Sequence, residues 1–194
     1  MSIKMLEDVY KSIQGFYNSG ELVFGEGKPN AEIMLIGEAP GRDEVQAGRP
    51  FCGKAGRNLD EFLATISLPR EDIFITNVCK FRPYKVSAKG TVSNRPPTRG
   101  EIEDALPFLY REITAVAPHC IVTLGNTPLR VCLGDFTAVI GQYHGHATDT
   151  EIDGRRYTLF ALYHPASIIY NPALKAAYST DLTALRAHIQ NENN

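Results

Sequence analysis

The order of apolar segments along the chain constrains its fold more than any other feature of the sequence. Four short, continuous apolar runs are rich in β-branched or aromatic residues, which is typical of strands buried on both faces. They are AEIMLIG at 31–37, DIFITNV at 72–78, HCIVTLG at 119–125 and YTLFALY at 157–163. Helical patterns lie between these runs, and strands that alternate with helices form mostly parallel sheets. The sequence therefore predicts a three-layer α/β/α sandwich with a mostly parallel central sheet.

The predicted helices are recognised by apolar residues spaced three or four positions apart. Such stripes occupy residues 3–16, 59–66 and 102–113. Thr98 and Glu101 have the spacing of a capping box, which predicts that the third of these helices starts there.

Turn and cap residues predict the structure of the last third of the chain. The final helix is expected to begin at Asn171 and Pro172, with Asn as the N-cap and Pro at the first helical position. An Asp153-Gly154 turn predicts a β-hairpin within residues 141–160, beside the final core strand.

The length and composition of the chain fit one compact unit. With 194 residues, of which 43% are hydrophobic, residues 1–194 are expected to form a single domain. No window approaches the roughly 18 consecutive apolar residues of a membrane span, and the first residues are not a secretory signal. We therefore expect a cytoplasmic protein with no membrane partner, and nothing in the sequence calls for a dimer, so a monomer is expected.

The cysteines do not form a recognisable ligand pattern. Cys52, Cys79, Cys120 and Cys132 are widely spaced, with no CxxC pair and no histidine at zinc-ligand spacing. The sequence therefore predicts no metal site and no disulfide framework, and instead four reduced thiols, most of them buried.

Polar residues follow each of the four predicted strands. Glu38 follows the first strand, Asn77 lies near the end of the second, Asn126 follows the third and His164 follows the fourth. Each could be an ordinary solvated or turn-capping residue. In an open α/β sheet, however, ligands bind at the carboxyl ends of the strands, so their joint placement predicts one site at that edge.

A strongly basic segment starts at the same predicted edge. The whole chain has a formal charge of −2, but residues 80–99 contain six lysines and arginines and no acidic residue. Contact with a phosphate backbone is one interpretation. A flexible, solvated loop whose charge serves solubility is the other.

Several segments together resemble the family-4 uracil-DNA glycosylases, the iron-sulfur branch of the uracil-DNA glycosylase superfamily. The matching stretches occur in order between residues 22 and 185, and include GEAPG at 37–41, GRPFCGKAG at 48–56, TNVCK at 76–80 and HPA at 164–166. GEAPG and HPA correspond to the two active-site motifs of that family. The resemblance implies a uracil-DNA glycosylase fold and a DNA-repair enzyme that hydrolyses the N-glycosidic bond of uracil, with other deaminated bases left open.

The resemblance also assigns roles around a flipped base. Gly37, Gly41, Gly48 and Gly53 would let the backbone approach the base and the sugar, and Ala39 is expected to bind the substrate together with Gly37 and Gly41. Phe51 would stack on the uracil ring. Because uracil has an N3–H donor and an O4 acceptor, the side-chain amide of Asn77 could read that edge and reject cytosine.

Two further residues are implied as catalytic, together with Asn77. His164 would donate a hydrogen bond to uracil O2 as negative charge builds on the leaving base. Glu38 matches the acidic residue of the first motif and would lie beside the base or the attacking water, with Asp43 and Glu44 as reserve candidates.

Five residues are expected to contact uracil-containing DNA. Lys80, Arg82 and Lys85 belong to the basic segment and would contact phosphates. Ile168 and Ile169 occupy the loop that enters the minor groove in the superfamily. Ordinary packing before the last helix is the alternative role of these two isoleucines.

The chain departs from the family at its metal cluster. Family-4 enzymes hold a [4Fe-4S] cluster with four cysteines, whereas this chain has none upstream of VFGEG, has Phe81 at a ligand position and has Ala105 near the fourth. Cys79 lies two residues away but has no partner cysteines, so we expect no cofactor, no metal cluster and no iron.

Three functional hypotheses follow. The first is an enzyme that excises uracil from DNA, and the second is a protein of the same fold that captures uracil-DNA without turnover. The third is an enzyme acting on a nucleotide or phosphate ligand, which is weakly supported because GEAPG is neither a GxGxxG nor a P-loop pattern. A covalent-capture branch of the superfamily carries a basic loop near residues 80–99, but this segment has no histidine.

Overall fold

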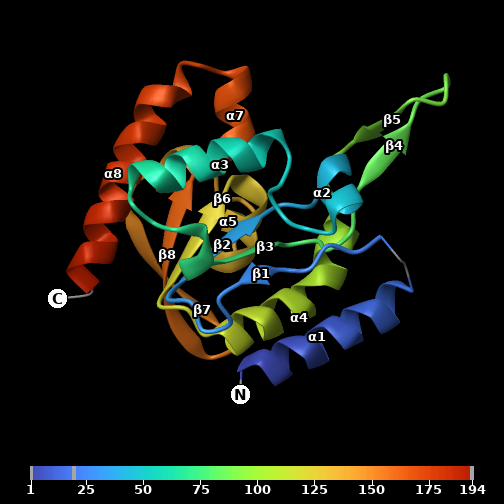
Figure 1. Cartoon of the computed structure of the whole chain (residues 1–194), viewed down its shortest axis with the longest axis horizontal. Helices are drawn as coiled ribbons and strands as arrows, with labels where there is room; N and C mark the ends of the chain where they lie inside the picture. The colour runs from blue at the N-terminus through green and yellow to red at the C-terminus, as the bar shows by residue number, and fades with distance from the viewer. Residues whose placement is uncertain (1, 19–20, 193–194) are drawn as a thin grey trace.

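The computed structural model describes residues 2–18 and 21–192 (Figure 1). The strands are β1 (Glu26–Gly27), β2 (Ile33–Gly37), β3 (Phe74–Asn77), β4 (Tyr84–Val86), β5 (Val92–Asn94), β6 (Cys120–Leu124), β7 (Ala147–Ile152) and β8 (Arg155–Leu162). The α-helices are α1 (Ser2–Tyr17), α2 (Arg42–Ala47), α3 (Lys54–Thr65), α4 (Arg99–Val116), α5 (Asn126–Leu133), α6 (Ile140–Tyr143), α7 (Pro165–Tyr170) and α8 (Leu174–Glu192), and a 3-10 turn spans Arg70–Asp72.

Six strands form the central sheet, in the order β1-β3-β2-β6-β8-β7. The four inner strands run parallel, and the two edge strands β1 and β7 pair antiparallel to their neighbours. Gly37 at the end of β2 lies opposite Asn77 at the end of β3, and Leu124 of β6 lies opposite Leu162 of β8. The chain therefore leaves all four parallel strands at the same edge of the sheet.

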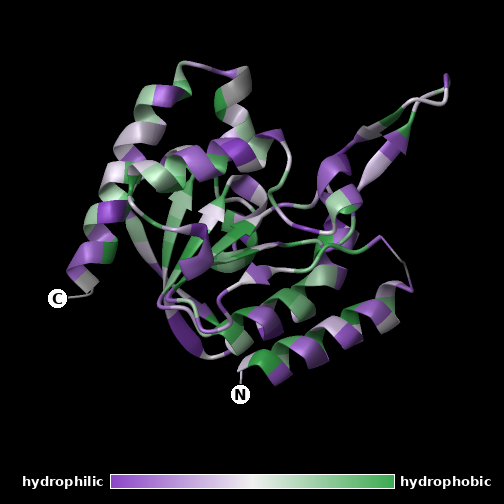
Figure 2. Ribbon diagram, viewed as in Figure 1, coloured by the Kyte–Doolittle hydropathy of each residue, from purple (hydrophilic) through white to green (hydrophobic). Residues whose placement is uncertain are grey.

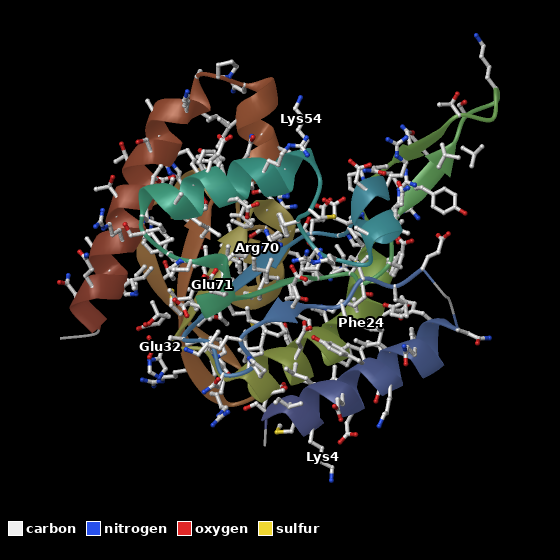
Figure 3. All side chains as sticks on the ribbon, in the orientation of Figure 1. Lys4, Phe24, Glu32, Lys54, Arg70 and Glu71 are labelled. Carbon is white, nitrogen blue, oxygen red and sulfur yellow. The ribbon has the colours of Figure 1, made fainter. Side chains whose placement is uncertain are left out.

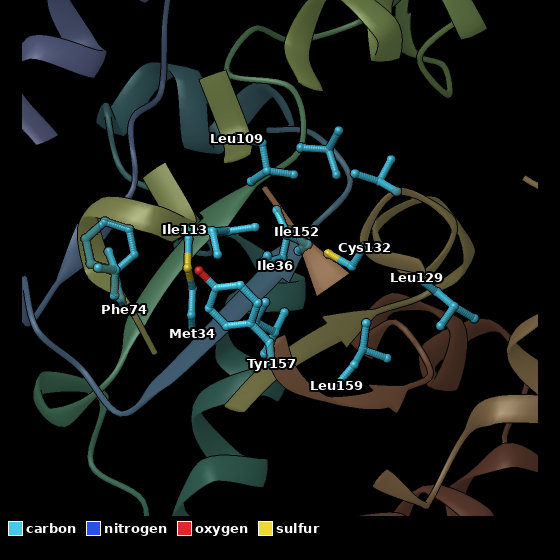
Figure 4. Close-up of a cluster of buried hydrophobic side chains, with 14 of the residues drawn as sticks. Met34, Ile36, Phe74, Leu109, Ile113, Leu129, Cys132, Ile152, Tyr157 and Leu159 are labelled. Carbon is cyan, nitrogen blue, oxygen red and sulfur yellow. The ribbon is translucent and has the colours of Figure 1, made fainter. Parts of the chain in front are cut away.

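Side chains that alternate along each strand face two separate hydrophobic clusters. Met34 and Ile36 of β2 pack with residues of α1, α4 and α5, as Figure 4 shows for Leu109, Ile113 and their neighbours. Ile33 and Leu35 point the other way and pack with residues of α3 and α8. This period of two on a sheet covered by helices on both faces confirms the predicted three-layer fold.

The outer faces of the helices are polar. Figure 2 shows apolar residues concentrated on the central strands and hydrophilic residues along the exposed sides of α1, α3 and α8. Lys4 of α1, for example, points away from the body of the protein (Figure 3). In the described part of the chain, no helix combines the length and the apolar character that crossing a membrane requires.

Two of the predicted local signals are confirmed. Thr98 caps α4 by accepting a hydrogen bond from the Glu101 N–H at 3.3 Å, and the Glu101 carboxylate accepts one from the Thr98 N–H at 2.6 Å. The Asp153-Gly154 turn joins β7 and β8 in an antiparallel hairpin, with Ile152 paired to Arg155.

Two other predictions are wrong. The last helix begins at Leu174 and not at Asn171, because the Asn171 Oδ1 accepts a hydrogen bond from the Ala173 N–H at 3.2 Å and so closes a turn between α7 and α8. Segment 165–170, which contains Ile168 and Ile169, forms the short helix α7 and is not a loop. Part of the basic segment also pairs as the hairpin β4–β5, which was not predicted from the sequence.

Candidate functional site

Three predicted site residues line one pocket of about 300 Å³ at the carboxyl edge of the sheet. Phe51 comes from the loop between α2 and α3, Asn77 from the end of β3 and His164 from the end of β8. The ring centroids of Phe51 and His164 are 5.9 Å apart, with an interplanar angle of 33°. Segments that are far apart in the sequence thus meet around one small cavity, which is also lined by Ala39 and Gly41.

Glu38 does not line this pocket. It lines an adjoining pocket of about 460 Å³, which also contains His164, Ala39 and Asn94. The Glu38 Oε2 accepts a hydrogen bond of 2.5 Å from the Thr127 hydroxyl at the start of α5. This bond fixes the carboxylate in the pocket that it shares with His164, which Phe51 does not line.

Gly37 explains how close the pocket residues come to the backbone. A Cβ atom on Gly37 would overlap the Asn77 Oδ1 and the ring of Phe51. Only glycine therefore lets these two side chains converge over the end of β2. Gly37 is also the first residue of the GEAPG segment, so this segment shapes the cavity through a missing side chain.

Phe51 is held in an unusual backbone conformation by Arg70. Its φ is +50°, in the left-handed region that non-glycine residues seldom adopt, and it is 5% exposed. The Arg70 Nη1 donates to the Phe51 carbonyl at 3.1 Å, and its Nη2 donates to the Pro50 carbonyl at 2.7 Å. Arg70 also pairs with Glu26 and Asp60, which fixes the guanidinium.

Sequence analysis missed the role of Arg70, because nothing in its local pattern points to a loop 19 residues away. Gly56 also helps to place this loop, because a Cβ atom at that position would collide with the Phe51 carbonyl. The aromatic ring in the pocket is thus positioned by a cation and a glycine outside it. Figure 3 labels Arg70 below α3, at the centre of the molecule.

Glu44 ties the two glycine-rich turns together. Its carboxylate accepts hydrogen bonds from the Gly41 N–H at 3.1 Å and from the Gly53 N–H at 3.4 Å. These bonds join the GEAPG segment to the turn that carries Phe51. Because both carboxylate oxygens serve the backbone, Glu44 is less suited than Glu38 to orient a water molecule.

His164 is held as a neutral imidazole with its proton on Nε2. The Nδ1 atom accepts a hydrogen bond from the Ala166 N–H at 3.1 Å, where α7 begins. Burial lowers the pKa of His164 to about 4, because the charged form would lose its hydration. Near neutral pH, His164 can therefore donate one hydrogen bond through Nε2.

The amide of Asn77 is available to a ligand. Asn77 is 3% exposed, and within the described residues its side-chain amide makes no hydrogen bond to the protein. Its main-chain carbonyl accepts a bond of 2.6 Å from the Lys80 ammonium. A buried amide that lines a pocket and keeps its polar atoms open can read a ligand by hydrogen bonds.

Lys80 is an internal ion-pair residue, which contradicts the expectation that it contacts DNA. It is 2% exposed, and its Nζ atom lies 2.7 Å from the carboxylate of Glu112, which is 0% exposed. Thr76 and Tyr10 complete this network with hydrogen bonds of 2.9 Å to the same carboxylate. With its donors used internally, Lys80 supports the backbone of Asn77 and cannot reach a phosphate.

The other residues that were expected to contact DNA differ in their exposure and packing. Lys85 is exposed on β4, and the Arg82 Nε donates to the Asn94 Oδ1 at 2.7 Å beside both pockets. Ile168 is partly buried against the cluster formed with α3 and α8, which favours its packing role. The side chain of Ile169 lies outside the described part of the structure.

The chain is similar in sequence to known proteins. A family model described as the uracil DNA glycosylase superfamily matches residues 24–186. The Type-4 uracil-DNA glycosylase of Archaeoglobus fulgidus is 40% identical over 160 residues, which cover 81% of this chain and 76% of that protein. The Type-4 uracil-DNA glycosylase of Thermotoga maritima is 32% identical over 177 residues, which cover 90% and 86%.

A solved structure has the same fold. The crystal structure of SMUG2 from Pedobacter heparinus has a TM-score of 0.58, with 98% of this chain and 85% of that chain covered. The two sequences are 15% identical, so this similarity supports the common fold and not a common activity.

Removing one member of the buried ion pair should destabilise the fold. We expect Lys80→Met to lower the free energy of unfolding by about 3–5 kcal/mol, because it leaves the Glu112 charge buried and unpaired. The double variant Lys80→Met/Glu112→Gln should recover most of this loss. Urea denaturation of both variants, with the exposed Lys4→Met as control, measures the difference, and equal stability of Lys80→Met and Lys4→Met would contradict the ion pair.

Acid should destabilise the protein through His164. The pKa of a histidine in an unfolded chain is about 6.5, whereas that of His164 is lowered to about 4. Between these values the unfolded chain binds the proton first, so this contribution to stability falls as the pH decreases from about 6.5 to 4. NMR titration of the imidazole C–H signals measures the pKa, and a His164 midpoint above 6 would contradict its burial as a neutral ring.

Proposed function

The chain belongs to the uracil-DNA glycosylase superfamily, and we propose that it hydrolyses the N-glycosidic bond of uracil in DNA at the pocket of Phe51, Asn77 and His164. One observation carries this proposal: an aromatic ring, an open amide and a neutral imidazole line the same small cavity. Excision of a base requires its extraction from the stack into such a pocket.

Phe51 and Asn77 would bind the base before the bond breaks. The aromatic ring offers a flat apolar face for stacking, which any base could use. The amide of Asn77 offers an acceptor to uracil N3–H and a donor to uracil O4. Cytosine presents the reverse pattern at these two positions, so a fixed amide orientation would reject it and supply the specificity.

His164 would stabilise the departing base. As the glycosidic bond breaks, negative charge accumulates on uracil O2, and the Nε2–H group of His164 can donate to this oxygen. A donor that is already oriented by the Ala166 N–H needs little reorganisation during the reaction. The neutral state is sufficient because the donor stabilises the uracil anion without transferring a proton.

Glu38 is the preferred residue for the attacking water. The sugar becomes oxocarbenium-like as the base leaves, so water can attack C1′ without a strong base. Glu38 lies beside His164 in the adjoining pocket, and its bond to Thr127 fixes the carboxylate there. Such a carboxylate can orient a water and stabilise positive charge on the sugar.

We propose that the reaction proceeds without an iron-sulfur cluster, because the residues at the corresponding place do not fit one. Phe81 occupies a ligand position, and its ring packs 5.1 Å from the ring of Tyr17. The thiol of Cys79 is buried, which raises its pKa to about 12 and disfavours the thiolate that iron requires. Within the described residues, no group of three or more His, Cys, Asp or Glu is placed to hold a metal ion.

An aromatic cluster joins the same elements instead. Tyr17 of α1 packs against Phe81 and against Phe108 of α4, and Phe16 packs against Tyr17 and Phe108, at centroid distances between 4.9 and 6.2 Å. Aromatic contacts of this kind stabilise the packing of α1 on α4 by apolar burial. They would supply the link that a cluster provides in family-4 relatives.

Purified protein should be colourless and free of iron. We expect no absorption near 400 nm and no iron by elemental analysis, even after anaerobic expression with iron and sulfide, because the ligand set is absent. A brown preparation with stoichiometric iron would contradict the proposal. The same measurement on a Type-4 relative prepared in parallel serves as the positive control.

Uracil excision is tested directly with labelled oligonucleotides. The protein is incubated with single- and double-stranded uracil-DNA, and abasic sites are cleaved with alkali. We expect His164→Ala to lower kcat by roughly 10²–10³, the usual effect of removing one such donor. We expect Asn77→Ala to lower kcat/KM and weaken the preference for uracil over cytosine. His119→Ala changes an exposed histidine that lines a different pocket, and should have no effect.

The alternative function has a different signature. A protein that captures uracil-DNA without turnover would leave no alkali-labile site and would form an adduct that survives denaturing electrophoresis. Stabilisation by free nucleotides but not by DNA in a thermal melt would indicate a nucleotide-binding enzyme. Either result would overturn the glycosylase proposal.

A further inference from the structure

The hairpin β4–β5 contributes only Asn94, at its base, to the pocket of Phe51, Asn77 and His164. Figure 1 shows it projecting outward beyond α2, away from the sheet. Its base is fixed by Arg95, whose Nε donates to the Tyr84 carbonyl at 3.1 Å. The guanidinium of Arg95 also binds both carboxylate oxygens of Glu101 at 2.7 Å, which lowers the pKa of Glu101 to about 2. The hairpin is therefore anchored to the start of α4 and has a defined direction.

The two faces of this hairpin are chemically different. Tyr84 pairs with Asn94, and Val86 pairs with Val92, and residues directly opposite each other share a face. One face therefore carries Tyr84, Val86 and Val92 in a row, while Lys85 lies on the other. These three apolar side chains are 51%, 58% and 50% exposed. Of the seven exposed large hydrophobic residues in the described chain, three lie on this one face.

The apolar face continues from the catalytic pocket. Asn94, which shares this face with Tyr84, lines both pockets at the sheet edge. From the Tyr84–Asn94 pair, the row of valines extends outward by two residues, or about 7 Å. A ligand strand whose base occupies the pocket would therefore meet Tyr84 first and the valines next.

The charge around this face complements a polyanion. Within the described residues, Lys85 and Lys89 form no ion pair, and Arg82 contacts only the neutral Asn94 among side chains. By contrast, Arg95 and Arg99 are neutralised by Glu101 and Glu103. Three cations therefore remain available to phosphates along the hairpin: Arg82 before β4, Lys85 on the face opposite the apolar row and Lys89 in the turn.

We propose that the β4–β5 hairpin is an arm that binds the unpaired nucleotides adjacent to the base in the pocket. Bases would stack on Tyr84 and pack on Val86 and Val92, while Lys85 and Lys89 contact phosphates. This placement of the bound strand rests on the proposed glycosylase function, because a base held in the pocket determines where its neighbouring nucleotides lie. An unpaired strand is the fitting occupant because it exposes the faces of its bases, whereas a duplex buries them in its stack.

Binding of a uracil-free strand tests the arm without requiring catalysis. The arm variant Tyr84→Thr/Val86→Thr/Val92→Thr keeps β-branched residues at exposed strand positions, so the fold should be retained. We expect it to weaken binding of a labelled 12-nucleotide single strand about tenfold or more, and to change binding of the matching duplex by less than about twofold. The control Ile3→Gln/Met5→Gln removes exposed apolar groups from α1 and should bind like the native protein.

The lysines have a separate readout in the salt dependence. Each lost phosphate contact should reduce the slope of log K against log salt by roughly 0.7 for a single strand. Lys85→Gln/Lys89→Gln should therefore flatten the slope, and Lys4→Gln/Lys28→Gln, at exposed positions outside the hairpin, should not.

The outcomes separate the arm from the glycosylase proposal. The native protein could leave uracil-DNA intact while the arm variant still binds the single strand more weakly than the native protein. In that case the proposed glycosylase activity is wrong and the proposed arm is supported. Unchanged single-strand binding by the arm variant would overturn the arm. Equal losses for single strand and duplex would assign the hairpin to duplex DNA, and a native dimer that dissociates in the arm variant would assign this face to a second copy of the chain. Both of these results would also overturn the proposal.

Discussion

The parallel register of the four inner strands is the constraint on which the site depends. Because β3, β2, β6 and β8 run in the same direction, the chain leaves each of them at one edge and must turn there. The residues that follow the strands are therefore neighbours in space, although more than one hundred positions separate Glu38 from His164. Gly37 completes this convergence, since any side chain at that position would separate Asn77 from Phe51.

Charged residues in and around the pocket hold its backbone in place. Arg70 fixes the left-handed backbone of Phe51, Glu44 joins the two glycine-rich turns, and Lys80 supports the carbonyl of Asn77. In each case an ionised group satisfies main-chain atoms that would otherwise lack partners. Such charge-assisted bonds are stronger than neutral ones, so they suit a site whose geometry must persist while a ligand enters and leaves.

An aromatic cluster links α1 to Phe81 and to α4. Tyr17 of α1 packs against Phe81, and Phe16 of α1 packs against Phe108 of α4. None of these four residues lines the pocket of Phe51, Asn77 and His164, so their contacts hold the helices together without entering the site. The hairpin β4–β5 is a separate feature, which projects outward beyond α2 (Figure 1).

The sequence by itself determined the features that depend on neighbouring residues. Short continuous apolar runs specified the strands, Thr98 and Glu101 specified the start of α4, and the Asp153-Gly154 turn specified a hairpin, because each signal acts within a few positions. It also identified the residues that line the pocket, by their place after strands and by resemblance. Only the tertiary structure decided that Lys80 is buried, since its partner Glu112 is 32 residues away, and that Arg70 holds Phe51 from 19 residues away. Long-range pairs of this kind leave no local pattern, because their energies depend on which surfaces the folded sheet and helices bring together.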